Sequence, residues 1–249
     1  ISRIFCALVV LIQLRRERQP IVVRDYLKIR PDWPMIGRIL GIGIPSGVEN
    51  SMFQLGKLAI QSTVSTLGTV AIAAQAMTNI LENLNGIAGI GVGVGLMTIV
   101  GQCMGANRKD EAVYYIKKLS VIAEVTIIVS CLLVFILTRP VTMLGGMEKT
   151  SADMCRHMVM WITIVKPIMW VLAFVPAYGL RAAGDVKFSM ISSCAVMWLC
   201  RFCLSVLLIR GLGFGPMGVW IGMFADWTVR AVLFTWRFHS RKWLEHKVI

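Results

Sequence analysis

Long apolar stretches alternate with short polar segments along the whole chain. Because about 20 consecutive apolar residues are enough to cross a bilayer, the pattern predicts six complete transmembrane helices. These cover approximately residues 35–67, 70–104, 112–138, 152–180, 186–209 and 214–238. We therefore expect an all-α fold, a polytopic membrane helix bundle with six complete transmembrane helices and the end of a seventh at the N-terminus.

The polar segments define the expected domain organisation. Residues 1–14 form the end of a truncated transmembrane helix, and residues 15–38 form a polar segment in which three prolines prevent one continuous helix. Residues 39–238 form the six-helix transmembrane lobe, and residues 239–249 form a polar tail.

The composition excludes an ordinary soluble domain. The 249 residues are 57% hydrophobic and 16% charged, whereas soluble proteins are roughly 45–50% apolar and about 25% charged. The formal net charge is +13. A nucleic-acid binder concentrates Lys and Arg on one face, but here they gather between the spans, so we expect no nucleic-acid partner. The positive-inside rule places residues 15–38, 105–118, 181–187 and the C-terminus in the cytoplasm, which predicts a multi-pass protein of the cell membrane (plasma or inner membrane).

Glycines recur at intervals of four residues within several predicted spans. Such small-xxx-small pairs let helices approach closely in a membrane. The pairs are Gly37/Gly41, Gly43/Gly47, Gly89/Gly93, Gly91/Gly95, Gly101/Gly105 and Gly218/Gly222.

Ionisable side chains inside the spans are the main functional candidates, because charge at membrane depth is costly in free energy and is often retained for function. Equal numbers of acids and bases are also typical of internal ion pairs, so both interpretations stay open. These residues are Glu49, Glu82, Glu124 and Asp226, together with Lys57, Lys166, Arg201 and Arg230.

Glu49 follows Pro45 by four residues, and the proline removes one backbone hydrogen bond from the helix. Freed carbonyls beside a carboxylate form a plausible site for Na⁺ or for a proton. Asn50 and Gln54 extend the polar surface of the same helix. The alternative is a structural ion pair between Glu49 and Lys57, eight residues further along.

Gln75, Asn79 and Glu82 form a polar stripe at helical spacing on the next predicted span. A polar stripe at membrane depth must face protein or a water-filled cavity. Two interpretations follow, a seam of hydrogen bonds between helices or the lining of a cavity.

Two further regions carry intramembrane charge. Asp226 is expected to pair with either Arg230, four residues later, or Arg201 on the preceding span. Lys166 directly precedes Pro167, and Trp170 lies one turn beyond it. Aromatic rings near a bent helix can bind organic cations through cation–π contacts, or they can lie at the membrane interface.

Enzyme signatures are absent from the sequence. It contains no H-E-x-x-H, Walker A or G-x-S-x-G motif, and its cysteines lie mostly in apolar runs as small hydrophobic residues. We expect no enzymatic activity, no catalytic residues, no metal site and no cofactor.

Three motifs resemble the multidrug and toxic compound extrusion (MATE) family. Residues 40–46 (LGIGIPS) are similar to the start of the family's seventh helix, and residues 100–107 (VGQCMGAN) are similar to the V-G-x-x-L-G-A turn after the eighth. Residues 179–185 (GLRAAGD) are similar to the L-R-G-x-G-D turn after the tenth. The order and spacing agree with the family over nearly the whole chain.

The resemblance implies that this chain is the C-terminal lobe of a two-lobed transporter, with residues 15–38 as the cytoplasmic inter-lobe linker. Family members are secondary antiporters that export organic cations and other xenobiotics in exchange for inward Na⁺ or H⁺. The implied partners are small cationic or amphipathic molecules, the bilayer and the N-terminal lobe of the same polypeptide. This chain departs from the family at Phe53 and Trp170, where other members carry an acid.

We therefore predict a secondary active antiporter for drugs or organic cations, with Glu49 and Asp226 as the coupling carboxylates. Arg201 and Arg230 are assigned to structural ion pairing. The alternatives are a lipid-linked oligosaccharide flippase, for which Lys57, Lys166 and Arg201 would supply a cationic cavity, and an intramembrane lipid-modifying enzyme. The predicted cavity residues are Asn50, Gln54, Gln75, Asn79, Glu82, Lys166 and Trp170.

Overall fold

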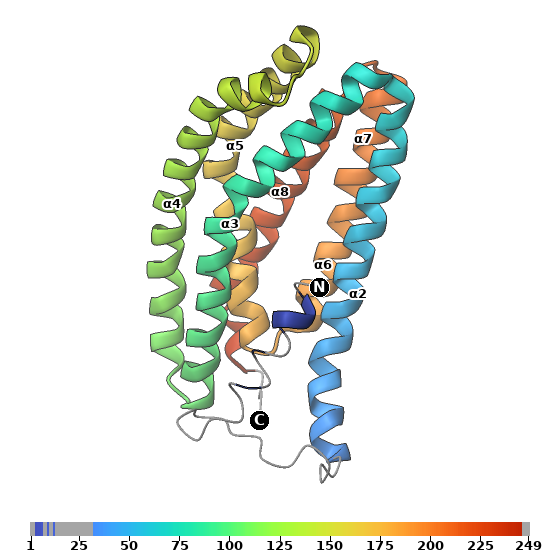
Figure 1. Ribbon diagram of the computed structural model, residues 1–249. Coiled ribbons are helices and arrows are strands. Elements are labelled where there is room, and N and C mark those ends of the chain that lie inside the picture. Colours follow the sequence, from blue (N-terminus) through green and yellow to red (C-terminus); the bar gives the residue numbers. More distant parts are fainter. Residues whose placement is uncertain (1–2, 7–8, 10–11, 13–31, 246–249) are drawn as a thin grey trace. The chain divides into compact units, whose positions relative to one another are not determined.

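The computed structural model describes residues 3–6, 9, 12 and 32–245 (Figure 1). The chain divides into two compact units, residues 1–41 and residues 42–249. In the first unit, residues 3–6, 9 and 12 are helical. The rest of that predicted helix, and residues 15–31 of the polar segment, lie outside the described residues.

Helix α2 (Trp33–Val64) begins within the predicted polar segment, before the expected boundary at residue 39. The Asp32 carboxylate accepts a hydrogen bond from the backbone N–H of Met35 (3.2 Å), which caps the helix. Pro34 lies in the first turn, where its missing N–H leaves no hydrogen bond unmade. Pro45 lies inside the helix, which continues through it.

The second unit is a series of helices joined by short turns, and the described residues contain no strand, which confirms the all-α fold. After α2 and the 3₁₀ turn η1 (Ser65–Leu67), Gly68 adopts a positive φ of 92° and ends the run. The remaining elements are α3 (Thr69–Gly105), α4 (Lys109–Leu144), α5 (Lys149–Ala182), α6 (Val186–Val196), η2 (Met197–Cys203), α7 (Leu204–Val206), η3 (Leu207–Gly211), α8 (Met217–His239) and η4 (Lys242–Glu245).

Five helical runs within the described residues are long and apolar enough to cross a membrane: α3, α4, α5, residues 186–211 and α8. They correspond to five of the six predicted complete spans. The sixth, α2, has 32 residues and is therefore about 48 Å long at 1.5 Å per residue. It is not among these five runs, and Glu49, Asn50, Gln54 and Lys57 interrupt its apolar sequence.

The core of the second unit lies among α3, α4, α5 and α8 (Figure 1), where α3 packs on α4 and α5, and α5 packs on α8. The run from α6 to η3 packs along α8. A smaller apolar cluster joins α2 to this run and to α8 through Ile60, Val64, Met197, Ile209 and Val219. The polar residues of α2 are therefore held beside α6, η2 and α8.

The predicted span at residues 186–209 is one helical run, but two of its segments are π-helical rather than α-helical. The first, η2, contains Arg201 between Cys200 and Phe202. A π-helical turn has a wider hydrogen-bond ring than an α-helical turn, and such turns are frequent at functional sites. The side chains that follow it point in directions that an α-helical pattern does not predict.

Two of the predicted glycine pairs make close helix contacts. A Cβ atom at Gly89 would lie 2.7 Å from both Ile127 Cδ1 and Trp170 Cζ3, and one at Gly218 would lie 3.0 Å from Ile209 Cγ1. The other four predicted pairs, which include Gly91/Gly95, have no such atom within 4 Å in the described chain. Among the predicted pairs, close approach is therefore found for α3 against α4 and α5, and for α8 against the preceding helical run.

We predict that Gly89→Ala destabilises the helix bundle. The new methyl group overlaps Ile127 and Trp170, and overpacking of a filled core costs about 1–3 kcal/mol. Gly91→Ala is the matched control, because its Cβ meets open space on the same helix. Thermal unfolding of the purified full-length protein in detergent measures the difference. A melting temperature for Gly89→Ala equal to that of the control contradicts the packing at this position.

Candidate functional site

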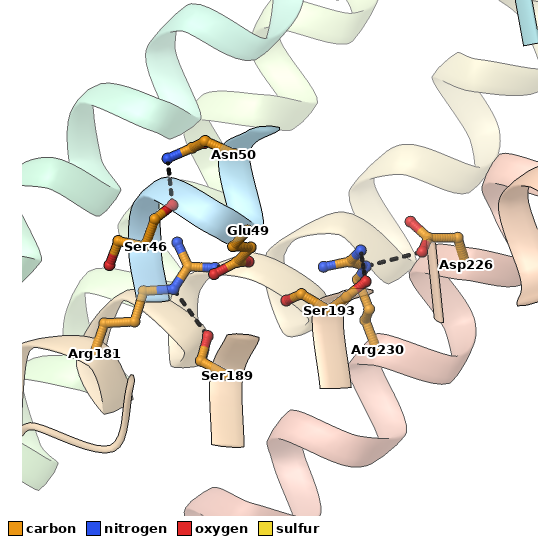
Figure 2. Close-up of polar contacts among 8 residues, drawn as sticks. All are labelled: Ser46, Glu49, Asn50, Arg181, Ser189, Ser193, Asp226 and Arg230. Carbon is orange, nitrogen blue, oxygen red and sulfur yellow. Dashed lines mark hydrogen bonds and ion pairs between the residues drawn. The ribbon is translucent and has the colours of Figure 1, made fainter. Parts of the chain in front are cut away.

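Glu49 is buried and forms an ion pair with Arg181, which lies in the last turn of α5 (Figure 2). Arg181 Nη2 donates to Glu49 Oε1 at 2.5 Å, and Arg181 Nε donates to the Ser189 hydroxyl of α6 at 2.8 Å. The guanidinium group of Arg181 thus links the Glu49 carboxylate of α2 to the Ser189 hydroxyl in the first part of α6. The alternative pair between Glu49 and Lys57 is not formed in the structure.

Asn50, next to Glu49, makes a local contact. Its side-chain amide donates to the backbone carbonyl of Ser46 at 3.0 Å, one turn earlier in α2 (Figure 2). This bond lies close to Pro45, where the helix lacks a backbone donor.

Asp226 pairs with Arg230 one turn later on α8, and both side chains are almost completely buried. Arg230 Nε donates to Asp226 Oδ1 at 2.9 Å, and Arg230 Nη2 donates to the backbone carbonyl of Ser193 at 2.8 Å (Figure 2). The pair therefore also holds α8 against α6. Of the two partners predicted for Asp226, the structure selects Arg230, and Asp226 Oδ2 has no hydrogen-bond partner among the described residues.

Lys166 pairs with Glu82 across α5 and α3. Lys166 Nζ donates to Glu82 Oε1 at 2.7 Å and to the Glu82 backbone carbonyl at 3.1 Å, and the Lys166 side chain is fully buried. It also lies 5.7 Å from the centre of the Trp170 ring. Lys166 therefore lies behind Glu82 and Trp170, and its charge is compensated there.

A cavity of about 610 Å³ opens between α2, α3, α5, η2 and α8. Its wall combines amide, charged and aromatic side chains. They include Phe53, Gln54, Lys57, Gln61, Gln75, Asn79, Glu82, Asn83, Trp170, Phe174, Tyr178, Arg201 and Trp227.

The cavity contains five of the seven residues predicted to line one: Gln54, Gln75, Asn79, Glu82 and Trp170. Asn50 and Lys166 are not part of its wall. Gln75 also accepts a hydrogen bond from Trp220 Nε1 at 3.0 Å, so the polar stripe of α3 both lines the cavity and bonds to α8.

Sequence reasoning missed Arg181 and the aromatic wall formed by Phe53, Phe174 and Tyr178. The only indication in the sequence that Arg181 matters is its position in the 179–185 motif. No feature of the sequence relates that position to Glu49. The aromatic residues lie in apolar helices, where a ring that lines a cavity and a ring in the core give the same pattern.

Two cationic side chains, one on the cavity wall and one behind it, lie against the Phe53 ring. The guanidinium groups of Arg201 and Arg230 lie 5.8 Å and 5.1 Å from the centre of the Phe53 ring. Arg230 also lies 5.7 Å from the Phe174 ring. Arg201 was expected in an ion pair, but among the described residues no carboxylate forms a salt bridge with it, and its Nε atom has no hydrogen-bond partner.

A metal site is not indicated by the described residues, which contain no group of three or more His, Cys, Asp or Glu side chains arranged to hold an ion.

Comparisons with known proteins agree on one family. The MatE family model matches residues 45–207. A probable multidrug resistance protein NorM of Thermotoga maritima is 24% identical over 224 residues, covering 89% of this chain and 47% of that protein. An FAD transporter of Shewanella oneidensis is 29% identical over 200 residues, covering 78% of this chain and 44% of that protein. The chain spans about half the length of these curated relatives.

Solved structures show the same fold. An outward-facing multidrug resistance MATE family transporter of the MOP superfamily gives a TM-score of 0.83 at 16% identity, covering 97% of this chain and 55% of that one. A MOP superfamily transporter from Pyrococcus furiosus, described as having a binding pocket of reverse polarity, gives a TM-score of 0.73 at 22% identity. It covers 82% of this chain and 45% of its own.

We predict that Arg230→Met destabilises the protein by about 3–5 kcal/mol, because it leaves the Asp226 carboxylate buried without a cation. The double variant Asp226→Asn with Arg230→Met has no buried charge and regains most of that loss. Arg210→Met, at the exposed end of the preceding helical run, is the control. Thermal unfolding in detergent ranks the three variants. Equal melting temperatures for the single and double variants would show that the ion pair is not what stabilises this contact.

Proposed function

The chain belongs to the MatE family, and we propose that it is the C-terminal half of a secondary active transporter that exports small amphipathic molecules in exchange for Na⁺ or H⁺. The names of its relatives, multidrug resistance proteins and an FAD transporter, support the transport of small molecules. Coverage of about half of each relative supports the assignment to one lobe. Family membership favours this function over the flippase and the lipid-modifying enzyme.

The chain is part of a membrane protein, as its five apolar helical runs and its family require. We propose the cell membrane as its location, with the α3–α4 turn, the α5–α6 turn and the C-terminus in the cytoplasm. The distribution of Lys and Arg supports this orientation.

The observation that carries the proposed mechanism is the buried ion pair between Glu49 and Arg181. Na⁺ or a proton that binds the Glu49 carboxylate competes with Arg181 for the same oxygen atoms. Binding of either ion therefore releases α2 from the turn between α5 and α6. Because α2 supplies one wall of the cavity, its release changes the shape and polarity of the substrate site.

Asp226 is proposed as the second coupling carboxylate. A cation bound there competes with Arg230, which also holds the Ser193 carbonyl of α6. Ion binding can drive export only if the ion and the substrate favour different conformations. The two ion pairs can make an ion favour one conformation, because Arg181 and Arg230 each fix a contact between helices that surround the cavity. Arg181 holds α2 to the end of α5, and Arg230 holds α8 to α6.

We assign substrate contact to Gln54, Gln75, Asn79, Glu82 and Trp170, which line the cavity. Two predicted cavity residues act from outside its wall. Asn50 stabilises the helix beside Pro45, and Lys166 holds Glu82 in place.

We predict that Glu49→Gln lowers ion-driven export by about tenfold, the loss expected when one charge-assisted interaction disappears. The full-length protein is expressed in an efflux-deficient bacterial host, and export of two dyes of opposite charge, ethidium and fluorescein, is followed by fluorescence. Glu111→Gln, in an exposed pair with Arg108, is the control and leaves export unchanged. Wild-type export rates for Glu49→Gln would remove Glu49 from the coupling mechanism.

A further inference from the structure

Two cationic side chains of the cavity wall lack a counter-charge. Lys57 on α2 and Arg201 on η2 both line the cavity. Within the described part of the chain, neither forms a salt bridge with a carboxylate. Arg201 Nε is buried and has no hydrogen-bond partner there.

The carboxylates nearest the cavity attract Arg201 electrostatically but form no salt bridge with it, because each is bonded to another cation. Glu82 lines the wall but is paired with Lys166, and Asp226 is paired with Arg230 behind the wall. Four cationic side chains at or directly behind the wall thus face two carboxylates, which leaves a formal excess of two positive charges. The local potential at the wall is positive.

Phe53 determines what Arg201 meets on α2. The face of its ring, rather than a carboxylate, lies against both Arg201 and Arg230. A ring quadrupole attracts a cation but does not neutralise it. On α2, Arg201 therefore meets an aromatic ring rather than a salt-bridge partner, and its charge can attract an anion in the cavity.

An uncompensated cation at membrane depth raises the free energy of the empty cavity. A bound anion removes that penalty and accepts charge-assisted hydrogen bonds from Lys57 and Arg201. A bound cation increases it. The wall also offers stacking surfaces, since Trp170 stacks on Phe174 with ring centres 5.0 Å apart and both line the cavity.

We infer that the cavity of this lobe binds an aromatic or otherwise planar anion, with carboxylate, sulfonate or phosphate groups held by Lys57 and Arg201. The ring system of the ligand lies against four aromatic side chains of the cavity lining, Phe53, Trp170, Phe174 and Trp227. This inference rests on the proposed function, in which the cavity is the substrate site. It names an anion as the preferred substrate class, where the sequence led us to expect an organic cation.

Two dyes with the same three-ring core and opposite charge test the inference. Fluorescein is an anion at neutral pH and rhodamine 6G is a cation. Fluorescence anisotropy with the purified full-length protein in detergent measures the affinity for each. We expect fluorescein to bind at least about tenfold more tightly than rhodamine 6G, and Lys57→Gln to weaken fluorescein binding by about tenfold, since one hydrogen bond to a charged group is lost.

The controls separate charge from folding. Lys57 is exposed to the cavity, so its replacement leaves the core intact, whereas Arg201→Gln alters a partly buried residue of η2. Lys118→Gln removes a cation from α4 outside the cavity wall and should not change binding. Lys57→Glu should reverse the preference of the cavity toward rhodamine 6G.

The outcomes distinguish this inference from the proposed function. Tighter binding of rhodamine 6G, or fluorescein binding that is unaffected by Lys57→Gln, overturns the inference even where dye export confirms a transporter. Fluorescein binding that requires Lys57 supports the inference even where neither fluorescein nor ethidium is exported. That absence of export would overturn the proposed function instead. Absence of binding by both dyes overturns the inference.

Discussion

A buried charge at membrane depth is costly without a partner, and three ion pairs that meet this need help to hold the helices of the lobe together. Glu49 binds Arg181, Glu82 binds Lys166 and Asp226 binds Arg230. The first two pairs each join two helices, and the third holds α8 to α6 through the Ser193 carbonyl. An unpaired charge in the same places would cost several kcal/mol. The cavity is therefore bounded by helices whose mutual contacts are partly ionic, and ionic contacts are the kind that a transported or coupling ion can replace.

The sequence predicts local features of this arrangement and leaves the long-range ones open. Apolar runs give the spans, and the polar stripe at Gln75, Asn79 and Glu82 is found on the cavity wall, because helical periodicity is a property of each segment alone. The pair between Asp226 and Arg230 joins neighbouring turns of one helix, so its spacing is visible in the sequence. Glu49 and Arg181 are separated by 132 residues, and only the tertiary packing brings them into contact.

One alternative and one expectation from the sequence are not realised among the described residues, and both have reasons of geometry. A pair between Glu49 and Lys57 requires contact across eight residues of helix, which is about 12 Å at the α-helical rise. Lys57 instead extends into the cavity, two turns from the carboxylate. Arg201 was expected to pair with a carboxylate, but it lies in the π-helical segment η2, which changes the direction of its side chain. Residues 197–203 contain no proline or glycine that would signal a departure from the α-helix. A prediction from the sequence therefore treats this segment as α-helical and gives the Arg201 side chain the wrong direction.

The two proposed coupling carboxylates differ in how readily their partners can be released. The Arg230 side chain is 2% exposed and its partner Asp226 is fully buried, whereas the Arg181 side chain is 25% exposed beside the α5–α6 turn. A guanidinium group displaced from Glu49 can therefore be hydrated as it leaves, but one displaced from Asp226 remains in a low-dielectric environment that raises the cost of separation. Competition by Na⁺ or a proton is accordingly easier at Glu49. Complete release of Arg230 also breaks its bond to the Ser193 carbonyl of α6, which adds to the cost of exchange at Asp226. The geometry thus orders the proposed steps, with ion binding at Glu49 preceding any exchange at Asp226.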